Sequence, residues 1–580
     1  MEYRLMVSDR NYTSWYYVDP EKYTRLSSPE LESVRPIERK WFTRDTVRVV
    51  DGELTVVHST VRTQKIIAGV LVLEQNRTFG RTENKKRLLY KCIPDDKHLP
   101  AFLIPYEIQL RFSKSIRNKY VLFSFDQWTD AQPRGLLVET LGDVDRIDVF
   151  YEYQLYCRSL HVPLAEMTDK TRAVLREHTK DEYIDQIAAN PAFRIATVGP
   201  DVRVFSIDPA GSVDFDDAFS ISPHATNGNM VVSVYIANVY VWLETMGLWK
   251  SFSRRVSTIY LPDRKRPMLP TVLSDSLCSL EAGQTRFAFC MSVEITPDGT
   301  VLADTAEFRN VAVSVAHNYV YETPEMAADA DYLALLVATQ RADKSVVDSH
   351  DVVAFWMIQT NVLCGAYLAN RETGIFRSAA LTNPEPDAIS AAIPETLDTE
   401  TRRFIHNWRN TTCQYTMYHP DADLGHAVMA KKTYVHITSP IRRLVDLLNQ
   451  ILFMEAAGMI SVIGADACEF RNQWMTHSQM EYINTTMRSI RKVQTDCEVL
   501  RAVVSRPDWL AKPHQGIVFD KMVRADATYT YIVYLSGLRL VSRVNSLVEL
   551  ENYRTYEFKM FMFEDEENIR NKIRLQLCEL

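Results

Sequence analysis

Four aspartates crowd into ten residues of an otherwise apolar segment, and this crowding constrains how the surrounding chain can fold. Residues 205–221 contain Asp208, Asp214, Asp216 and Asp217. A Pro-Ala-Gly turn after the first of them folds the chain back toward the other three. Buried carboxylates repel one another and lose hydration, so they need a counter-charge. Magnesium supplies that charge through oxygen ligands, and two such ions can activate water and stabilise a leaving oxygen.

Two other interpretations of this segment remain open. The spacing is also compatible with an exposed acidic turn or with a calcium-binding loop. An EF-hand loop is excluded, because no glutamate stands at the position that would complete its coordination sphere. Spacing alone therefore leaves the metal site as one of three interpretations.

A second polar segment places two arginines where a helix is expected to begin. Thr438 or Ser439 is suited to the N-cap, and the proline that follows is suited to the first helical position. Arg442 and Arg443 then fall in the first turn, where cations are unfavourable beside the partial positive charge of the helix N-terminus. A bound phosphate would relieve this conflict by accepting hydrogen bonds from backbone N–H groups and a guanidinium. The alternative is an ordinary ion pair between Arg442 and Asp446.

The composition restricts how such a site could be used. The net charge of the 580 residues is −8, which argues against nucleic acid wrapping the outer surface. RNA would instead have to bind in a local groove or channel. The nine cysteines form no Cys-x-x-Cys pair and indicate core thiols in a reducing compartment. No apolar run approaches about 18 residues and no secretory leader stands at the start, so we expect an intracellular protein, cytoplasmic or nuclear, with no membrane partner.

The chain alternates between strand-rich and helix-rich stretches. Short β-branched and aromatic runs such as 120–126 indicate strands in the first part of the chain, enough for two small barrels. A charged helical connector is expected at 167–189. From 195 to 505 strands mix with long helices, and apolar residues three and four apart predict an amphipathic helix over 479–504. Strand patterning returns over 512–580 and suits a third small barrel.

Three motifs of the chain resemble those of the RNB, or ribonuclease II-like, family. Residues 206–218 are similar to the family pattern I-D-P-x-G-x-x-D-x-D-D-A, and residues 436–443 to H-F-T-S-P-I-R-R. Between them, residues 260–270 look like a further block of the family. Residues 126–143 resemble the second cold-shock domain of eukaryotic members of the exosome-catalytic-subunit type. These motifs occur in family order, and the resemblance weakens only over the first 60 residues.

The resemblance implies a multidomain α+β fold, with OB-like β-barrels around a central mixed α/β catalytic domain. No N-terminal endonuclease domain is expected, because the chain ahead of the cold-shock region is too short. The expected domains are a first cold-shock-like OB domain at 1–60, a second at 61–165, a helical connector at 166–194, the RNB catalytic domain at 195–510 and a C-terminal OB-fold RNA-binding domain at 511–580.

The resemblance also implies roles for individual residues. The four aspartates match the carboxylates that hold magnesium, with manganese as a substitute, and orient the attacking water. Arg442 matches the arginine that stabilises charge on the scissile phosphate. Tyr260 matches a tyrosine that clamps the terminal nucleotide and Tyr321 an aromatic that contacts RNA, although unaided each would be an ordinary core tyrosine. The further substrate-binding residues are expected to be Thr438, Ser439 and Arg443.

The chain also departs from the family pattern. Tyr235 and Asn238 stand in a segment that usually reads H-I-A-D-V, and Leu444 stands where a tyrosine is common. Ala354 and Phe355 fall in a segment that is usually V-E-E, so a glutamate is missing. None of these changes removes a metal carboxylate or the key arginine, but they leave rate and end-product length open.

The leading hypothesis is a magnesium-dependent 3′→5′ exoribonuclease that degrades single-stranded RNA to nucleoside 5′-monophosphates. The alternative is a catalytically weak or inactive RNA-binding scaffold with the same fold. A metal-dependent phosphatase or a calcium-binding module would have no use for three OB-like domains. Single-stranded RNA is the expected partner, and membership of a larger RNA-degradation complex is left open.

Overall fold

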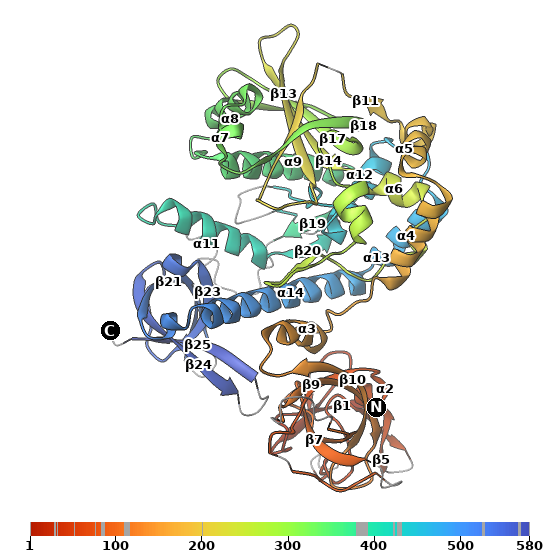
Figure 1. Cartoon of the computed structure of the whole chain (residues 1–580), viewed down its shortest axis with the longest axis vertical. Coiled ribbons are helices and arrows are strands. Elements are labelled where there is room, and N and C mark those ends of the chain that lie inside the picture. Colours follow the sequence, from red (N-terminus) through yellow and green to blue (C-terminus); the bar gives the residue numbers. More distant parts are fainter. Residues whose placement is uncertain are drawn as a thin grey trace.

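In the computed structural model, both ends of the chain form β-structures, and both lie on the lower side of a central α/β domain in Figure 1. A long helix runs along one side of the central domain and ends at the C-terminal sheet (Figure 1). The structure describes residues 2–578 except 28–30, 32, 51–52, 76, 83–86, 109–115, 200, 379–392, 422–423, 426–431, 525–527 and 566–569.

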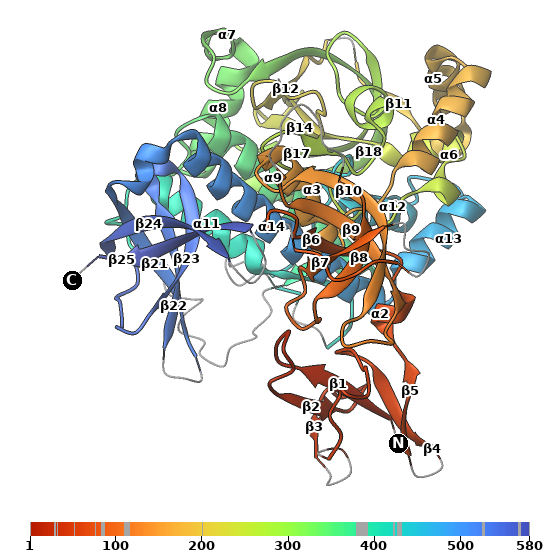
Figure 2. The same ribbon diagram turned by 60° about the horizontal axis from the view of Figure 1, so that its bottom comes forward.

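The first strands form an open antiparallel sheet that lies beyond the neighbouring barrel (Figure 2). Its order is β3-β2-β1-β4-β5, and its core is continuous with that of the barrel. A fully buried carboxylate, Asp45, accepts hydrogen bonds from the Phe42 amide at 2.9 Å and the Ser59 hydroxyl at 2.5 Å. The elements are β1 (Glu2–Val7), β2 (Trp15–Val18), β3 (Arg25–Leu26), β4 (Thr46–Val50), β5 (Glu53–His58) and the helix α2 (Thr60–Thr63).

The next five strands close into a barrel in the order β10-β8-β7-β6-β9. Its alternating strands turn apolar side chains such as Phe102 and Phe123 inward. A Cβ atom at Gly135 would stand 2.8 Å from the Phe123 ring, so only glycine fits where β10 crosses β9. The strands are β6 (Ile67–Leu71), β7 (Leu88–Pro94), β8 (Phe102–Tyr106), β9 (Lys119–Gln127) and β10 (Arg134–Asp143).

Three helices connect the barrel to the central domain. The third begins at a capping box, in which Thr179 accepts from the Glu182 amide and the Glu182 carboxylate accepts from the Thr179 amide. Buried Tyr183 and Ile187 then pack this helix against the central core. The helices are α3 (Ile147–Cys157), α4 (Ala165–Glu177) and α5 (Lys180–Ala189).

The central sheet has the order β11-β18-β12-β13-β14-β17, and β17 also pairs with β18. Its strands bury apolar residues on both faces; in β14, for instance, Val232, Val234 and Ile236 alternate with Ser233 and Tyr235, and all five are buried. The strands are β11 (Ala196–Thr197), β12 (Val204–Asp208), β13 (Asp217–Pro223), β14 (Met230–Ala237), β17 (Thr285–Ile295) and β18 (Val301–Val320).

Helices and two small two-stranded sheets complete the central domain. Among the described helices, α9 alone has the length and composition to cross a membrane, but half of its most apolar stretch is buried within the fold. The two-stranded sheets are β15 (Ile259–Tyr260) with β16 (Lys265–Arg266), and β19 (Ile375–Ser378) with β20 (Gln414–Met417). The helices are α6 (Val239–Thr245), α7 (Pro324–Ala327), α8 (Ala330–Ala342), α9 (Ser349–Asn370), α11 (Thr399–Thr412), α12 (Leu444–Ala456), α13 (Ala465–Trp474) and α14 (His477–Ser505).

One helix start differs from the prediction. Helix α12 begins at Leu444, and Arg443 occupies the N-cap position, so Thr438 and Ser439 are not its caps. Residues 439–442 form a turn instead, because the carboxylate of Asp446 accepts a hydrogen bond from the Ser439 amide at 2.8 Å and draws the chain across the helix end. The predicted helix over 479–504 is present as α14.

The C-terminal strands form a five-stranded antiparallel sheet in the order β23-β22-β21-β24-β25. One face holds a compact core that includes Val518, Val533 and Phe558. The strands are β21 (Pro513–Val523), β22 (Tyr529–Leu535), β23 (Leu540–Ser546), β24 (Thr555–Asp565) and β25 (Arg570–Leu577).

Candidate active site

The acidic turn joins two neighbouring strands of the central sheet. Asp208 is the last residue of β12 and Asp217 the first of β13, and the two strands are antiparallel neighbours. Gly211 adopts a φ of 81° between them, a conformation that glycine takes without strain. The hairpin therefore returns the chain to the level of Asp208. Sheet pairing brings the two ends of the motif together.

The carboxyl groups of the acidic turn influence one another electrostatically, and the effect on Asp217 is the largest. The pKa of Asp217 lies well above the ordinary value because the carboxyl is buried and because the charges of Asp208 and Asp216 repel its anion. Burial also raises the pKa of Asp208 to about 6, although the Ser206 hydroxyl donates to its carboxylate at 2.7 Å. The three carboxyl groups thus share one buried, electrostatically strained site.

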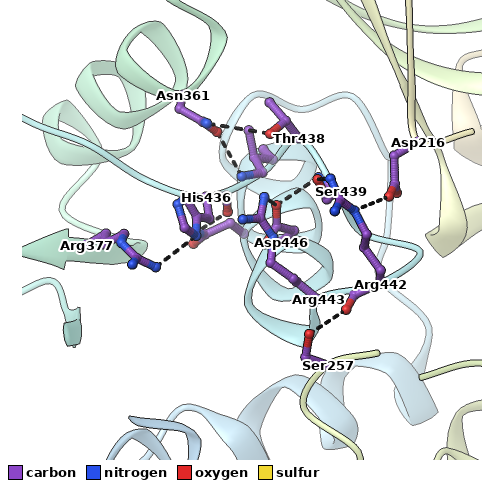
Figure 3. Close-up of polar contacts among 12 residues, drawn as sticks. Asp216, Ser257, Asn361, Arg377, His436, Thr438, Ser439, Arg442, Arg443 and Asp446 are labelled. Atoms are coloured by element: carbon purple, nitrogen blue, oxygen red, sulfur yellow. Dashed lines mark hydrogen bonds and ion pairs between the residues drawn. The ribbon is translucent and has the colours of Figure 1, made fainter. Parts of the chain in front are cut away.

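Asp216 makes the contact that joins the acidic turn to the arginine segment (Figure 3). Its carboxylate accepts hydrogen bonds from the Ile441 amide at 2.9 Å and from Nε of Arg442 at 3.0 Å. Burial raises the pKa of Asp216 to about 7, while the Arg442 charge acts to lower it. The ion pair links residues 226 positions apart in the chain.

Asp214 has a counter-charge of its own. Nζ of Lys265 lies 2.9 Å from the carboxylate of Asp214 and 2.9 Å from that of Asp275. This lysine stands in β16, the hairpin partner of the strand that carries Tyr260. The fourth aspartate therefore belongs to a neighbouring ion-pair network that borders the three-carboxylate group.

Arg442 is held at its backbone and at one edge of its guanidinium group. Its carbonyl accepts hydrogen bonds from the Thr258 amide and the Ser257 hydroxyl, both at 2.9 Å, and its Nη2 donates to the Ser439 hydroxyl at 3.1 Å. The side chain nevertheless remains 43% exposed. The alternative pairing of Arg442 with Asp446 is wrong, because Arg443 binds Asp446 at 2.8 Å.

Buried polar groups fix the loop that carries the arginines. Asn361 on α9 accepts from the Ile437 amide at 3.0 Å and donates to the Thr438 hydroxyl at 3.5 Å (Figure 3). Asn449 on α12 donates to the His436 carbonyl at 2.9 Å. Because Thr438 is buried and bonded within the protein, its position suits anchoring of the loop rather than contact with a substrate.

The two expected substrate tyrosines both lie beside the site. Tyr260 is 43% exposed, and its pKa, raised mainly by burial, responds to the charges of Arg442 and Asp214. Tyr321 follows β18 and donates its amide to the Asp208 carbonyl at 3.1 Å. Its ring stacks on His350 with centroids 3.8 Å apart and planes 11° apart. The structure thus places both aromatic rings close to residues of the acidic turn.

Four residues of this site were not predicted from the sequence. Lys265 balances Asp214, Ser257 positions the Arg442 backbone, Asn361 fixes the arginine loop, and His350 stacks on Tyr321. Each comes from a different segment and meets its partner only through tertiary packing. Only Lys265 carried a local signal, because it lies between residues 260 and 270, within one of the family-like motifs.

The departures from the family pattern have structural explanations at three positions. Tyr235 is buried on β14 and its hydroxyl lies 3.0 Å from that of Ser220. Asn238 caps α6 by accepting from the Val241 amide at 3.4 Å. Leu444 is fully buried at the start of α12. These three side chains serve packing and capping.

The donor set is chemically suited to a divalent cation. Asp208 and Asp217 are carboxylates with raised pKa values, and neither makes an ion pair among the described residues. Two hard oxygen donors in need of positive charge fit magnesium. As the described side chains stand, however, no three His, Cys, Asp or Glu residues are grouped closely enough to be recognised as a ligand set. The two aspartates therefore suit magnesium by their charge and by their oxygen donors.

This geometry defines a class: a central α/β domain with a buried acidic cluster and an arginine, flanked by small β-structures. Comparison with known proteins adds a domain match. Residues 200–331 and 329–457 match the model described as the RNB domain.

The relatives and solved structures agree with that domain match. Human exosome complex exonuclease RRP44 is 23% identical over 456 residues, which cover 66% of this chain and 46% of the relative. Among solved structures, Mycoplasma genitalium RNase R with ribose-methylated single-stranded RNA matches with a TM-score of 0.66 at 15% identity, over 99% of this chain and 100% of that one. Yeast Ssd1, a pseudonuclease, matches with a TM-score of 0.57 at 13% identity, over 96% and 80%.

These comparisons confirm the predicted multidomain α+β fold and the family resemblance. At the identities of the solved structures, the likeness demonstrates a shared fold. The chain spans less than half the length of these curated exonuclease relatives. One neighbour being a pseudonuclease makes activity a separate question from fold.

Proposed function

We propose that this chain is a 3′→5′ exoribonuclease that hydrolyses single-stranded RNA to nucleoside 5′-monophosphates with magnesium. The observation that carries the proposal is the ion pair between Asp216 and Arg442, which joins a buried acidic cluster to a half-exposed guanidinium group. Hydrolysis of a phosphodiester requires stabilisation of both the attacking water and the developing negative charge. This arrangement offers groups for both tasks.

The acidic side of the site would hold the metal and the water. Asp208 and Asp217 are the carboxylates that would bind magnesium, which when bound lowers the pKa of water and neutralises phosphate charge. Asp216 would orient the attacking water and, through Nε, the Arg442 guanidinium. Asp214 would act from the border of the cluster, because Lys265 already holds its carboxylate.

The cationic side would bind the scissile phosphate. One edge of the Arg442 guanidinium is fixed by Asp216 and Ser439, and the exposed part is free to donate to a phosphate oxygen. Arg443 would contribute long-range positive charge, because Asp446 holds its head group. Ser439 and Thr438 would act through the loop, by fixing where Arg442 stands.

Aromatic rings would position the RNA bases. Tyr260 is exposed beside Arg442, and Tyr321 presents a ring stacked on His350 beside Asp208. Stacking suits unpaired bases and accepts any sequence. A net charge of −8 favours binding in a local channel over binding to the outer surface. We therefore propose single-stranded RNA as the substrate of an intracellular enzyme; relatives named as exosome exonucleases suggest a larger complex.

A second candidate is an RNA-binding scaffold without activity. It is favoured by two observations: the described side chains do not form a ready ligand set for a metal, and the pseudonuclease Ssd1 has the same fold. The two candidates share RNA binding and differ only in release of mononucleotides.

One experiment separates them. A 5′-labelled single-stranded RNA is incubated with the chain and Mg²⁺, and products are resolved by chromatography and by gel. We expect nucleoside 5′-monophosphates and a ladder that shortens from the 3′ end, and no products with EDTA. Binding without mononucleotide release in Mg²⁺ or Mn²⁺ would establish the scaffold instead.

A further inference from the structure

The C-terminal sheet has a second apolar face that its own core does not use. Its five antiparallel strands have the order of an OB-type barrel, and one face packs inward around Val518 and Phe558. The opposite face of β21, β22 and β23 carries Ile517, Phe519, Ile532, Tyr534 and Val541. OB-folds bind oligonucleotides on the outer face of their second and third strands.

Helix α11 of the central domain covers this face (Figures 1 and 2). Ile405 is fully buried against the strands. Trp408 meets the Phe519 ring edge-on, with centroids 6.4 Å apart. Phe404 stacks on Tyr534 with centroids 3.8 Å apart and planes 9° apart. The face is therefore occupied by a segment of the same chain.

Two contacts of α11 have the chemistry of a bound nucleotide. Bases bind single-strand-binding surfaces by parallel stacking on aromatic rings, which is the arrangement of Phe404 on Tyr534. Phosphates bind such surfaces through arginine, and the carboxylate of Glu400 lies 2.9 Å from Nε of Arg539. The helix thus places a flat ring and an anion where RNA would place a base and a phosphate.

The surroundings of Arg539 favour an anion larger than one carboxylate. Arg539 lines a cavity together with Arg501, Arg506 and Trp509, at the end of α14. Arg506 packs over the indole of Trp509 and makes no ion pair with any described carboxylate. The only acidic residue among the lining residues is Glu498, which binds Arg501 at 2.5 Å. The cavity is cationic in a chain whose net charge is −8.

Helix α11 is held from the other side by ion pairs that do not involve the sheet. Arg403 lies 3.1 Å from Asp348 and 2.7 Å from Asp351, both at the start of α9. Both partners of Arg403 are partly exposed, and pairs of this kind contribute little to stability. The sheet face and the ion pairs therefore hold α11 through separate contacts.

We propose that α11 is an internal mimic of RNA that closes the nucleic-acid face of the C-terminal sheet, and that single-stranded RNA must displace it to bind there. The inference rests on the proposed function, because it takes RNA as the ligand. RNA that displaced α11 would gain stacking on Tyr534 and would release Arg539 from Glu400.

The test compares Phe404→Ala with Phe561→Ala in the full chain. Phe561 is an exposed aromatic residue of the same sheet outside the α11 contact, so its truncation is the matched control. Affinity for a fluorescent oligouridylate is measured in EDTA, where hydrolysis is suppressed. The apparent Kd is the intrinsic Kd divided by the fraction of open molecules, so loss of the stack should tighten binding about fivefold for Phe404→Ala and leave binding by Phe561→Ala unchanged. Unchanged or weaker binding by a folded Phe404→Ala chain would overturn the proposal.

A second measurement needs no variant. Hydrogen exchange of the wild-type chain is followed across residues 399–412 with and without the oligonucleotide. Displacement predicts faster exchange when RNA is bound, whereas unchanged or slower exchange would overturn the proposal. Mononucleotide release by the wild-type chain in Mg²⁺ is measured in parallel. If release is absent the proposed function fails, and if release persists while both α11 readouts are negative only this inference fails.

Discussion

The buried aspartate of the first sheet can be compared with the buried aspartates in the acidic turn of the central domain. In the first sheet Asp45 accepts hydrogen bonds from the Phe42 amide and the Ser59 hydroxyl. In the turn Asp216 is satisfied by the Ile441 amide and the Arg442 guanidinium. Burial raises the pKa of Asp45 to about 6 and that of Asp216 to about 7. The two carboxyl groups are electrostatically similar.

The difference between the regions lies in what converges on each carboxyl group. The partners of Asp45 come from its own sheet and the helix beside it, and its site is closed. Asp216 has two further carboxylates beside it, and its arginine remains 43% exposed. A raised pKa therefore marks burial, whereas convergence of several charges around an accessible group marks a site that can bind a ligand. The predictions below test this distinction.

The largest effect is expected for Asp216→Asn. The amide keeps the shape of the side chain but loses the charge that orients water and Arg442, so RNA hydrolysis should fall about 10⁴-fold, the scale found when one member of a catalytic unit is removed. RNA affinity in EDTA should change little. Single-turnover release of labelled mononucleotide measures the loss. Asp45→Asn is the control, and equal activity of the two variants would remove the distinction between the regions.

Arg442→Ala should have the next largest effect. If the guanidinium stabilises charge on the scissile phosphate, its loss should cost about 2–4 kcal/mol in kcat, as for an oxyanion donor. The matched control is Arg443→Ala, because Arg443 is engaged with Asp446 and should affect the stability of α12 more than kcat. A change confined to KM in Arg442→Ala would assign it to substrate positioning.

The acidic site was predictable where chemistry lies close together in sequence. One hairpin holds all four carboxylates, Asp208, Asp214, Asp216 and Asp217. Such crowding in an apolar segment is visible in the sequence alone. The convergence of Arg442 on that hairpin followed from the family resemblance. Its partner could not be chosen from spacing, because Arg443 and Arg442 are equally placed to bind Asp446 until Ser257 and Asp216 fix the loop.

The cover over the C-terminal sheet could not be predicted in this way. The alternation of residues 529–535 predicts a strand with two usable faces, but it does not say that α11 buries one of them. Phe404, Ile405 and Trp408 read as one apolar stripe of a helix, which would suit any apolar surface. Asn361, His350 and Lys265 likewise acquire their roles only from residues that are distant in the chain or in another element. Long-range packing, not local pattern, decides these contacts.

A smaller effect is expected for Lys265→Ala. Its loss leaves the carboxylates of Asp214 and Asp275 without the cation that both contact at 2.9 Å. Asp214 would then be displaced from the border of the acidic cluster, and kcat should fall about tenfold, or ~1.4 kcal/mol. Lys265→Arg keeps the charge and should retain most of the activity. A loss as large as that of Asp216→Asn would place Asp214 at the centre of the site.

Asp45→Asn is expected to leave activity unchanged. Its effect should appear in the free energy of unfolding instead. The folded chain holds the Asp45 proton more tightly than the unfolded chain does, since burial raises the pKa from 3.8 to about 6. The stabilising contribution of the protonated Asp45 carboxyl is therefore fully present below pH 4. It is lost as the pH rises through 6, because the folded state must then bury a charge. The loss is at most about 3 kcal/mol, the free-energy equivalent of that shift.

Thermal unfolding of the wild type and Asp45→Asn between pH 4 and pH 7.5 measures this contribution as the difference between the two chains, since all other groups titrate in both. As the pH rises, the unfolding temperature of the variant should increase relative to that of the wild type. A difference that does not vary with pH would mean that the Ser59 and Phe42 hydrogen bonds already stabilise the ionised carboxylate. In that case Asp45 and a member of the acidic cluster would differ in pKa as well as in convergence, and titration alone would separate the two regions.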